Sequence, residues 1–181
     1  MIRNLPLLVP LAAVALACAG QAPRPTVKLP PLAGKPLDVE AQDLAGRPVR
    51  IDGGKGRVLI VDFFASWCVP CKVQLPHLDR LERELKPQGL EVYGVSFDED
   101  LDAIRGFAAR MAVGFPVLWD RGGEKLAPAL SIQRLPTTLL VDRTGTIRKV
   151  HLGYDSREGE RLEAEVRELL GEPAPQAAAS R

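Results

Sequence analysis

The sequence is poor in cysteine and histidine, and it has no excess of either charge. Its three cysteines are too few for the disulfide framework of small secreted domains, so packed side chains must stabilise the fold. The 24 basic and 23 acidic residues give a net charge of +1, which argues against nucleic acid or an anionic membrane surface as a partner. An apolar run covers only residues 5–17, which is shorter than the roughly 20 residues of a membrane-spanning helix.

The first 19 residues have the pattern of an export signal. Arg3 supplies a short positive region before the apolar run, and the segment Val14–Cys18 is similar to a bacterial lipobox. We therefore expect a lipoprotein signal over residues 1–19 with lipidation of Cys18, which would anchor the protein in the bacterial cell envelope on the periplasmic side. Ordinary cleavage after Ala19 and an uncleaved anchor are the alternatives.

Composition divides the rest of the chain into three parts. Residues 20–36 hold five prolines and little apolar periodicity, which predicts a semi-extended tether. Residues 37–171 carry the patterns of one folded domain, long enough to bury a core of its own. Residues 172–181 are rich in alanine and proline, which predicts a disordered tail.

Hydrophobic periodicity within residues 37–171 predicts strands that alternate with helices. A nearly continuous apolar run over residues 57–64 indicates a central strand that is covered on both faces. The other predicted elements are a hairpin over residues 39–51, helices over 68–85, 101–111, 125–130 and 157–170, strands over 89–97 and 116–119, and a hairpin over 137–152. This order predicts an α/β fold with a central mixed β-sheet flanked by helices.

A Cys-x-x-Cys motif lies where the central strand gives way to the first helix. Unpaired N–H groups and the helix dipole favour a thiolate there, so Cys68 is the expected nucleophile. Cys71 lies one turn later and is the expected resolving thiol, and Pro70 suits a first helical turn because it needs no N–H there. The alternative is half of a zinc site, for which His77 and His151 are the only histidines available.

Two residues beside the motif are candidates for supporting roles. Asp62 is the one charged residue of the apolar strand, and burial of a carboxylate raises its pKa. A carboxyl group of this kind can accept the proton of Cys71 as that thiol attacks and return it in the reverse step. Trp67 directly precedes the nucleophile and is expected to shield it and to offer a docking surface. The alternatives are a solvated aspartate at the strand end and a tryptophan of the core.

Other polar residues have simpler interpretations. His77 falls on the polar side of the predicted helix with Arg80 and Glu84, so we expect a solvated histidine. The acidic run over residues 98–100 comes just before a predicted helix, where acids more often cap the helix than bind a cation.

The segment Val61–Lys72 resembles the active-site block of the thioredoxin superfamily, and within it the chain resembles the TlpA/ResA-type extracytoplasmic proteins. Pro76 matches the proline that kinks the family's active-site helix, and Arg134–Thr138 is similar to the segment with its cis-proline. The resemblance implies a thioredoxin fold with an N-terminal β-hairpin and a strand–helix insertion over about residues 90–120.

The resemblance also implies a site. The Leu135–Pro136 bond is expected to be cis, in a loop that faces the nucleophile. Leu135 and Pro136 would then bind substrate together with Trp67 and Pro70. No metal or other cofactor is implied besides the redox-active disulfide of the two motif cysteines.

The function that the resemblance implies is protein thiol–disulfide exchange outside the cytoplasm. We expect a membrane-tethered, monomeric reductant of disulfides in exported proteins, of the cytochrome c or copper-site maturation type, with a membrane thiol-electron transporter as donor. A thiol oxidant or isomerase is an alternative, because direction depends on how far the thiolate is stabilised. A thiol peroxidase of the peroxiredoxin-like class is a second alternative. A copper carrier of the Sco type is a third, but it needs three residues between the cysteines.

Overall fold

The computed structural model describes residues 32–53 and 56–174, and one mixed β-sheet runs through its centre. The expected export signal, lipidation at Cys18 and most of the expected tether and tail lie outside these residues. Within them, no helix combines the length and the apolar character that crossing a membrane requires.

The sheet has seven strands, which follow the expected order along the chain. They are β1 (Asp38–Asp43), β2 (Pro48–Asp52), β3 (Val58–Phe64), β4 (Leu90–Ser96), β5 (Val117–Trp119), β6 (Thr137–Val141) and β7 (Ile147–Leu152). In space their order is β2-β1-β5-β4-β3-β6-β7. Strand β3 pairs in parallel with β4 and antiparallel to β6, so the central sheet is mixed, as predicted.

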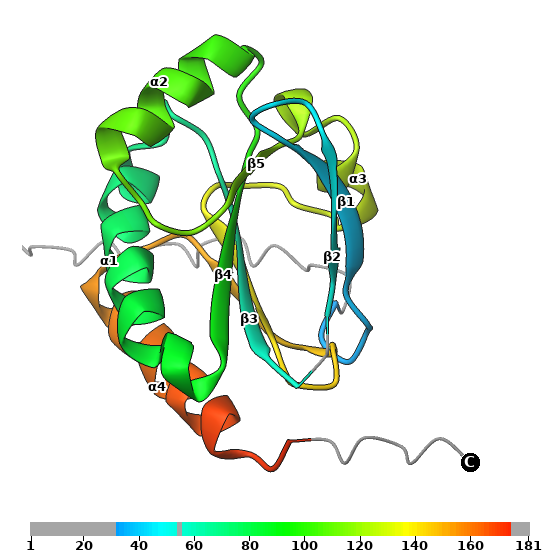
Figure 1. Cartoon of the computed structure of the whole chain (residues 1–181), viewed down its shortest axis with the longest axis vertical. Coiled ribbons are helices and arrows are strands. Elements are labelled where there is room, and N and C mark those ends of the chain that lie inside the picture. Colours follow the sequence, from blue (N-terminus) through cyan, green and yellow to red (C-terminus); the bar gives the residue numbers. More distant parts are fainter. Residues whose placement is uncertain (1–31, 54–55, 175–181) are drawn as a thin grey trace, which may run out of the picture.

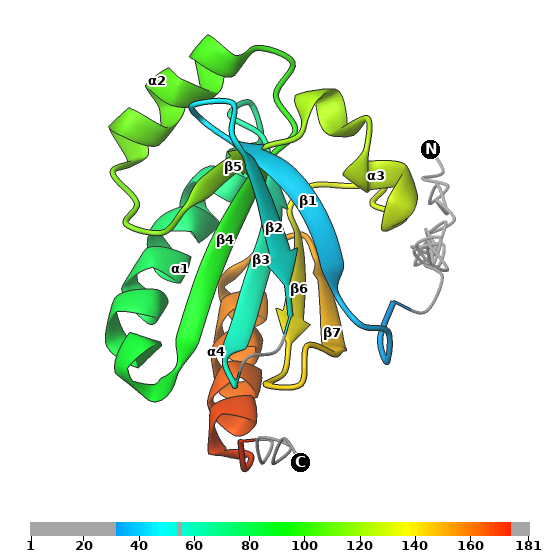
Figure 2. The same ribbon diagram turned by 45° about the vertical axis from the view of Figure 1, so that its right-hand side comes forward.

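The described residues form four α-helices: α1 (Val69–Leu85), α2 (Leu101–Met111), α3 (Leu126–Ala129) and α4 (Ser156–Gly171). Short 3₁₀ turns, η1 (Lys86–Gln88) and η2 (Arg121–Gly123), follow α1 and β5. Helices α1 and α4 lie on one side of the sheet and α3 on the other (Figures 1 and 2). The N-terminal hairpin β1–β2 and the inserted unit β4–α2–β5 are both present, which confirms the expected variant of the fold.

The central strand β3 explains how the site residues are oriented. All seven of its residues are buried, and alternate side chains enter two different cores. Ile60 and Phe64 pack into the core beneath α1 and α4, whereas Val61 and Phe63 pack into the core beneath α3. Because side chains alternate along a strand, Asp62 points into the layer beneath α1 and α4.

The folded domain begins before the expected boundary at residue 37. Leu32 is buried in the core beneath α3. The Gly34 N–H donates to the Ile147 carbonyl oxygen at 2.7 Å, and Pro36 forms a β-bridge with Thr146. Proline content alone had placed these residues in the tether. Their contacts with β7 and the β6–β7 turn make them part of the domain instead.

Candidate active site

The two motif cysteines lie at the start of α1 and are joined by a disulfide bond. Cys68 is the N-cap of the helix, and its Sγ accepts a hydrogen bond from the Cys71 N–H at 3.3 Å. Cys68 retains 5% exposure and Cys71 none, so the first cysteine is the less buried of the two. A sulfur that caps a helix lies where backbone N–H groups and the helix dipole stabilise negative charge, which suits Cys68 for the thiolate role.

Asp98, just after β4, anchors the turn that leads into the dithiol. Its carboxylate accepts hydrogen bonds from the Ser66 N–H at 2.9 Å and from the Ser66 hydroxyl at 2.6 Å. A third bond comes from the Ser96 hydroxyl at 2.6 Å. The turn is closed by the Cys68 N–H, which donates to the Ala65 carbonyl oxygen at 3.0 Å. The carboxylate of a buried acid therefore fixes the backbone two residues before the nucleophile.

Three residues close to Cys68 in the sequence expose large apolar side chains. Trp67 is 67% exposed, Val69 70% and Val73 63%. This exposure contradicts the alternative in which Trp67 belongs to the core. Exposed apolar groups gathered in one place often mark an interaction site.

A cis peptide bond joins Leu135 to Pro136, as the resemblance implied. Leu135 packs against the core cluster that contains both motif cysteines. The Pro136 carbonyl oxygen accepts a hydrogen bond from the Gly153 N–H at 2.8 Å, which ties the loop to the end of β7. The structure thus brings this loop to the same region of the sheet as the dithiol.

Asp62 is fully buried beneath α1, which excludes the alternative of a solvated strand-end aspartate. Burial raises the pKa of its carboxyl group to about 7, although a hydrogen bond from Thr138 acts in the opposite direction. The Thr138 hydroxyl donates to Asp62 Oδ1 at 2.6 Å and accepts from Gln74 Nε2 at 2.7 Å. A carboxyl group with a pKa near neutrality can both accept and donate a proton under ordinary conditions.

Sequence reasoning missed Thr138, which donates a hydrogen bond to Asp62, and Gln74, which donates one to Thr138. Gln74 carried a usable signal, because it occupies a core position of α1, between Cys71 and Leu78 in the buried stripe of the helix. A polar residue in such a stripe needs a buried partner. Thr138 carried no such signal, since threonine is ordinary in a strand.

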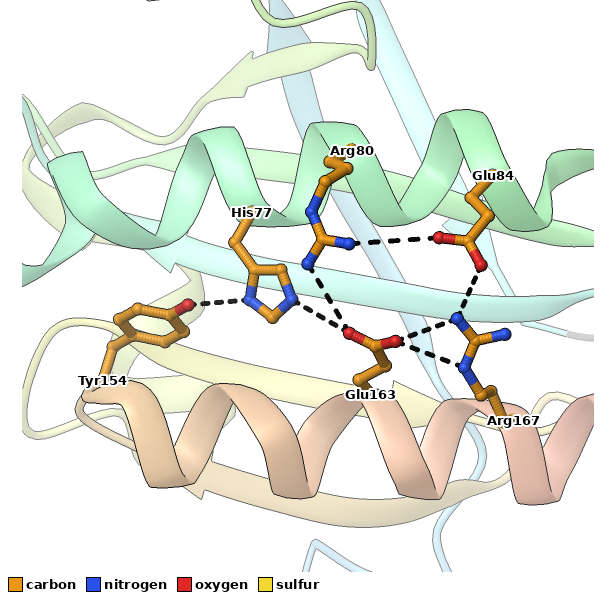
Figure 3. Close-up of polar contacts among 6 residues, drawn as sticks. All are labelled: His77, Arg80, Glu84, Tyr154, Glu163 and Arg167. Carbon is orange, nitrogen blue, oxygen red and sulfur yellow. Dashed lines mark hydrogen bonds and ion pairs between the residues drawn. The ribbon is translucent and has the colours of Figure 1, made fainter.

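The expectation that His77 is solvated is wrong. Its side chain is only 13% exposed, and its Nδ1 lies 2.7 Å from the Tyr154 hydroxyl while its Nε2 lies 3.5 Å from a Glu163 carboxylate oxygen. Figure 3 shows these contacts within a larger network between α1 and α4 that includes Arg80, Glu84 and Arg167. Helix α4 covers this side of α1, and periodicity within α1 could not show that a second helix packs there.

The last residue of the acidic run before α2 caps that helix, as expected. Asp100 is the N-cap of α2, and its side chain accepts a hydrogen bond from the Asp102 N–H at 2.9 Å. Within residues 32–53 and 56–174, no group of three or more His, Cys, Asp or Glu side chains is placed to hold a metal ion.

A helix-capping pair of cysteines at the end of the central strand, in a sheet of this topology, defines the thioredoxin fold class. A comparison with models of protein families identifies the family. The chain belongs to the AhpC/TSA family, whose model matches residues 33–150.

Curated relatives agree with this class. The chain is 33% identical over 112 residues to thiol-disulfide oxidoreductase ResA of Halalkalibacterium halodurans, an alignment that covers 62% of this chain and 63% of the relative. It is 31% identical over 121 residues to ResA of Geobacillus thermodenitrificans, covering 67% of this chain and 69% of the relative. The match to the first of these relatives thus spans less than two thirds of its length.

Similarity to solved structures supports the same fold class. The crystal structure of a Chlorobium tepidum protein assigned as thiol:disulfide interchange protein DsbE is similar, with a TM-score of 0.71 and 27% identity. That similarity covers 77% of this chain and 97% of the other. The resemblance to extracytoplasmic thioredoxin-like proteins is thereby confirmed at the level of family and fold.

Proposed function

We propose that the protein reduces disulfide bonds in exported proteins by dithiol–disulfide exchange. The observation that carries the proposal is the pair of unequal cysteines: Cys68 caps a helix and keeps slight exposure, whereas Cys71 is completely buried, in the layer into which Asp62 also points. The similarity to a thiol-disulfide oxidoreductase and to a thiol:disulfide interchange protein supports dithiol–disulfide exchange as the reaction.

The chemistry follows from these positions. The Cys68 thiolate attacks one sulfur of the substrate disulfide, forming a mixed disulfide and releasing the first substrate thiolate. Cys71 then gives its proton to the Asp62 carboxylate and attacks Cys68 Sγ. This second attack forms the Cys68–Cys71 disulfide and expels the other substrate thiolate, so that two electrons have passed to the substrate.

Four residues are proposed to bind the substrate around the reacting sulfur. Trp67 and Pro70 flank it on the side of α1, and Leu135 and Pro136 flank it on the side of the cis-proline loop. Cysteine-containing segments with apolar neighbours would suit the exposed apolar side chains here. Lipidation of Cys18 would hold the domain at the membrane, near a thiol-electron transporter that regenerates the dithiol.

The reduction potential of the Cys68–Cys71 pair in the full-length protein tests the direction. We expect a value well below about −220 mV, in the range of thioredoxin. A value near about −120 mV, in the range of strong periplasmic oxidants, would contradict the reductant proposal in favour of an oxidant.

Thiol peroxidase remains the second candidate because the matching family is AhpC/TSA. The Cys-x-x-Cys arrangement argues against it, since a buried resolving thiol one helical turn away suits dithiol exchange. Consumption of hydrogen peroxide by the reduced protein, at a rate comparable to its reaction with protein disulfides, would favour the peroxidase.

A further inference from the structure

Two separate parts of the chain are proposed to bind the substrate around the dithiol. One is the start of α1, which carries both cysteines, and the other is the loop of Leu135 and Pro136 before β6, far along the chain. Reaction between two sulfurs requires a defined geometry, so a small displacement of one part against the other slows it. The contacts that join the cis-proline loop to α1 therefore bear on the reaction.

A series of contacts joins the cis-proline loop to α1. The N–H of Gly153, which follows β7, donates to the Pro136 carbonyl oxygen at 2.8 Å. Tyr154 comes next in the chain, and its hydroxyl lies 2.7 Å from His77 Nδ1 on α1. The two rings also lie against each other, with their centroids 5.9 Å apart. Each step from Pro136 to the helix that carries the dithiol is thus a covalent bond or a hydrogen bond.

The surroundings of the two rings determine the direction of their hydrogen bond. His77 Nε2 lies 3.5 Å from a Glu163 carboxylate oxygen, which favours the proton on that nitrogen and leaves Nδ1 as the acceptor. Burial raises the pKa of the Tyr154 hydroxyl, so this group keeps its proton and donates to Nδ1. Arg167 donates to the same carboxylate group at 2.9 Å and holds it in place (Figure 3). We call the contact from hydroxyl to imidazole the Tyr154–His77 bridge.

Helix α4 leaves room for the Tyr154–His77 bridge by means of a glycine. Gly159 is buried in the early part of α4, although glycine is among the least favourable residues within a helix. A Cβ atom at this position would lie 2.8 Å from the Tyr154 hydroxyl oxygen and 3.2 Å from His77 Nδ1. A larger residue would therefore displace the two atoms that form the bond. The bridge explains why a poor helix former occupies this position.

A clamp between α1 and α4 does not explain the Tyr154–His77 bridge, because other contacts already join these helices. Figure 3 shows ion pairs between Arg80 of α1 and Glu163 of α4, and between Glu84 of α1 and Arg167 of α4. Tyr154 belongs to neither helix. It precedes α4 and directly follows the residue whose N–H holds the cis-proline loop. The bridge thus adds a connection between α1 and that loop.

We propose that the Tyr154–His77 bridge holds the cis-proline loop at a fixed position relative to the dithiol, which makes Tyr154 and His77 positioning residues for the substrate. This role rests on the proposed function, because it concerns how a peptide segment binds at the same site. The substrate class that depends on the bridge is an extended peptide with a disulfide-bonded cysteine, since such a segment contacts α1 and the loop at once. A small disulfide that reacts with Cys68 without contacting the loop does not depend on it.

Stopped-flow oxidation of the reduced full-length protein can compare these two kinds of substrate. The extended probe is the symmetric disulfide dimer of a short cysteine-containing peptide, and the small probe is dithiodipyridine. Tyr154→Phe removes the hydroxyl and keeps the ring. We expect the peptide concentration at half-saturation to rise about fivefold, because the loop is less preorganised, while the limiting rate stays parental. The rate constant with dithiodipyridine and the reduction potential should also stay parental.

Gly159→Ala tests the Tyr154–His77 bridge from the side of α4. Its added Cβ should raise half-saturation for the peptide in the same way and leave the reaction with dithiodipyridine parental. Gly171→Ala is the matched control, because it makes the same change in the same helix where a Cβ would have no atom within 4 Å. Tyr93→Phe is the control for the lost hydroxyl, since that ring packs against the core beneath α3. Both controls should keep parental kinetics with both probes.

The outcomes separate the two proposals. Parental half-saturation in Tyr154→Phe overturns the positioning role. An equal loss of rate with the peptide and with dithiodipyridine also overturns it, because the change would then act on the dithiol itself. If Tyr154→Phe does not fold, parental half-saturation in Gly159→Ala overturns the role equally. A parent protein that reacts with dithiodipyridine but not with the peptide dimer would instead contradict the proposed function.

Discussion

The buried Asp62 carboxyl group should destabilise the folded protein near neutral pH, and Asp62→Asn should remove this effect. Burial raises the pKa from 3.8 to about 7 in the folded state. The folded state therefore holds a proton that the unfolded state releases between these two values. The free energy of unfolding falls as pH rises through this window, by about 3 pKa units at about 1.4 kcal/mol each, or about 4 kcal/mol. No solvent screening reduces the figure, because the group is completely buried.

Urea unfolding of the oxidised protein at about pH 4 and pH 8 measures this effect. Asparagine keeps the shape and can still accept the hydrogen bond from Thr138, so the variant should gain about 4 kcal/mol over the parent at pH 8 and little at pH 4. Glu99→Gln is the matched control, because that side chain is 76% exposed and should leave the pH dependence as in the parent. A stability difference that does not change with pH would refute the burial argument.

Three further variants test neighbouring parts of the site. Thr138→Val removes the hydrogen bond that lowers the pKa of Asp62. The pH at the midpoint of the stability change should therefore rise by about one unit. Urea unfolding at a series of pH values measures it. Asp98→Asn weakens the group that accepts two hydrogen bonds from Ser66. The variant should lose about 3 kcal/mol of unfolding free energy, and iodoacetamide should alkylate its reduced Cys68 more slowly. Parental values for both would contradict the anchoring role. Trp67→Ala should change unfolding free energy by less than about 0.5 kcal/mol, because the ring is exposed, while raising KM for a protein disulfide; an unchanged KM would exclude docking.

The elements could be predicted from the sequence because their signals are local. The buried stripe of α1 recurs at helical spacing through Leu75, Leu78, Leu81 and Leu85, and all four are buried. The apolar run of β3 is continuous because the strand feeds two cores, one on each face of the sheet. Cys68 could be placed at the start of a helix because the continuous apolar run of β3 ends there and apolar residues at helical spacing follow.

The hydrogen bond between Thr138 and Asp62 could not be predicted, because it depends on register between strands far apart in the chain. Nothing near Asp62 in sequence indicates that Thr138 stands opposite it, or that His151 follows on the next strand. A slip of one residue between β6 and β7 would turn His151 away from Glu158 and Glu165 of α4. The error over His77 has the same origin, since the covering helix α4 begins at Ser156, far along the chain.

The hydrogen-bonded neighbours of Asp62 are neutral, which explains why its carboxyl group titrates near neutral pH. Thr138 and Gln74 contribute a hydroxyl and a carboxamide, neither of which ionises in this range. The raised pKa therefore has desolvation as its main cause, and the group titrates without a second buried acid coupled to it through Thr138. A carboxylate at position 74 would add a second negative charge at the other side of the shared hydroxyl and divide the titration into two steps. The cost in stability of burying Asp62 and the proton acceptance from Cys71 that we propose for it thus have the same physical cause.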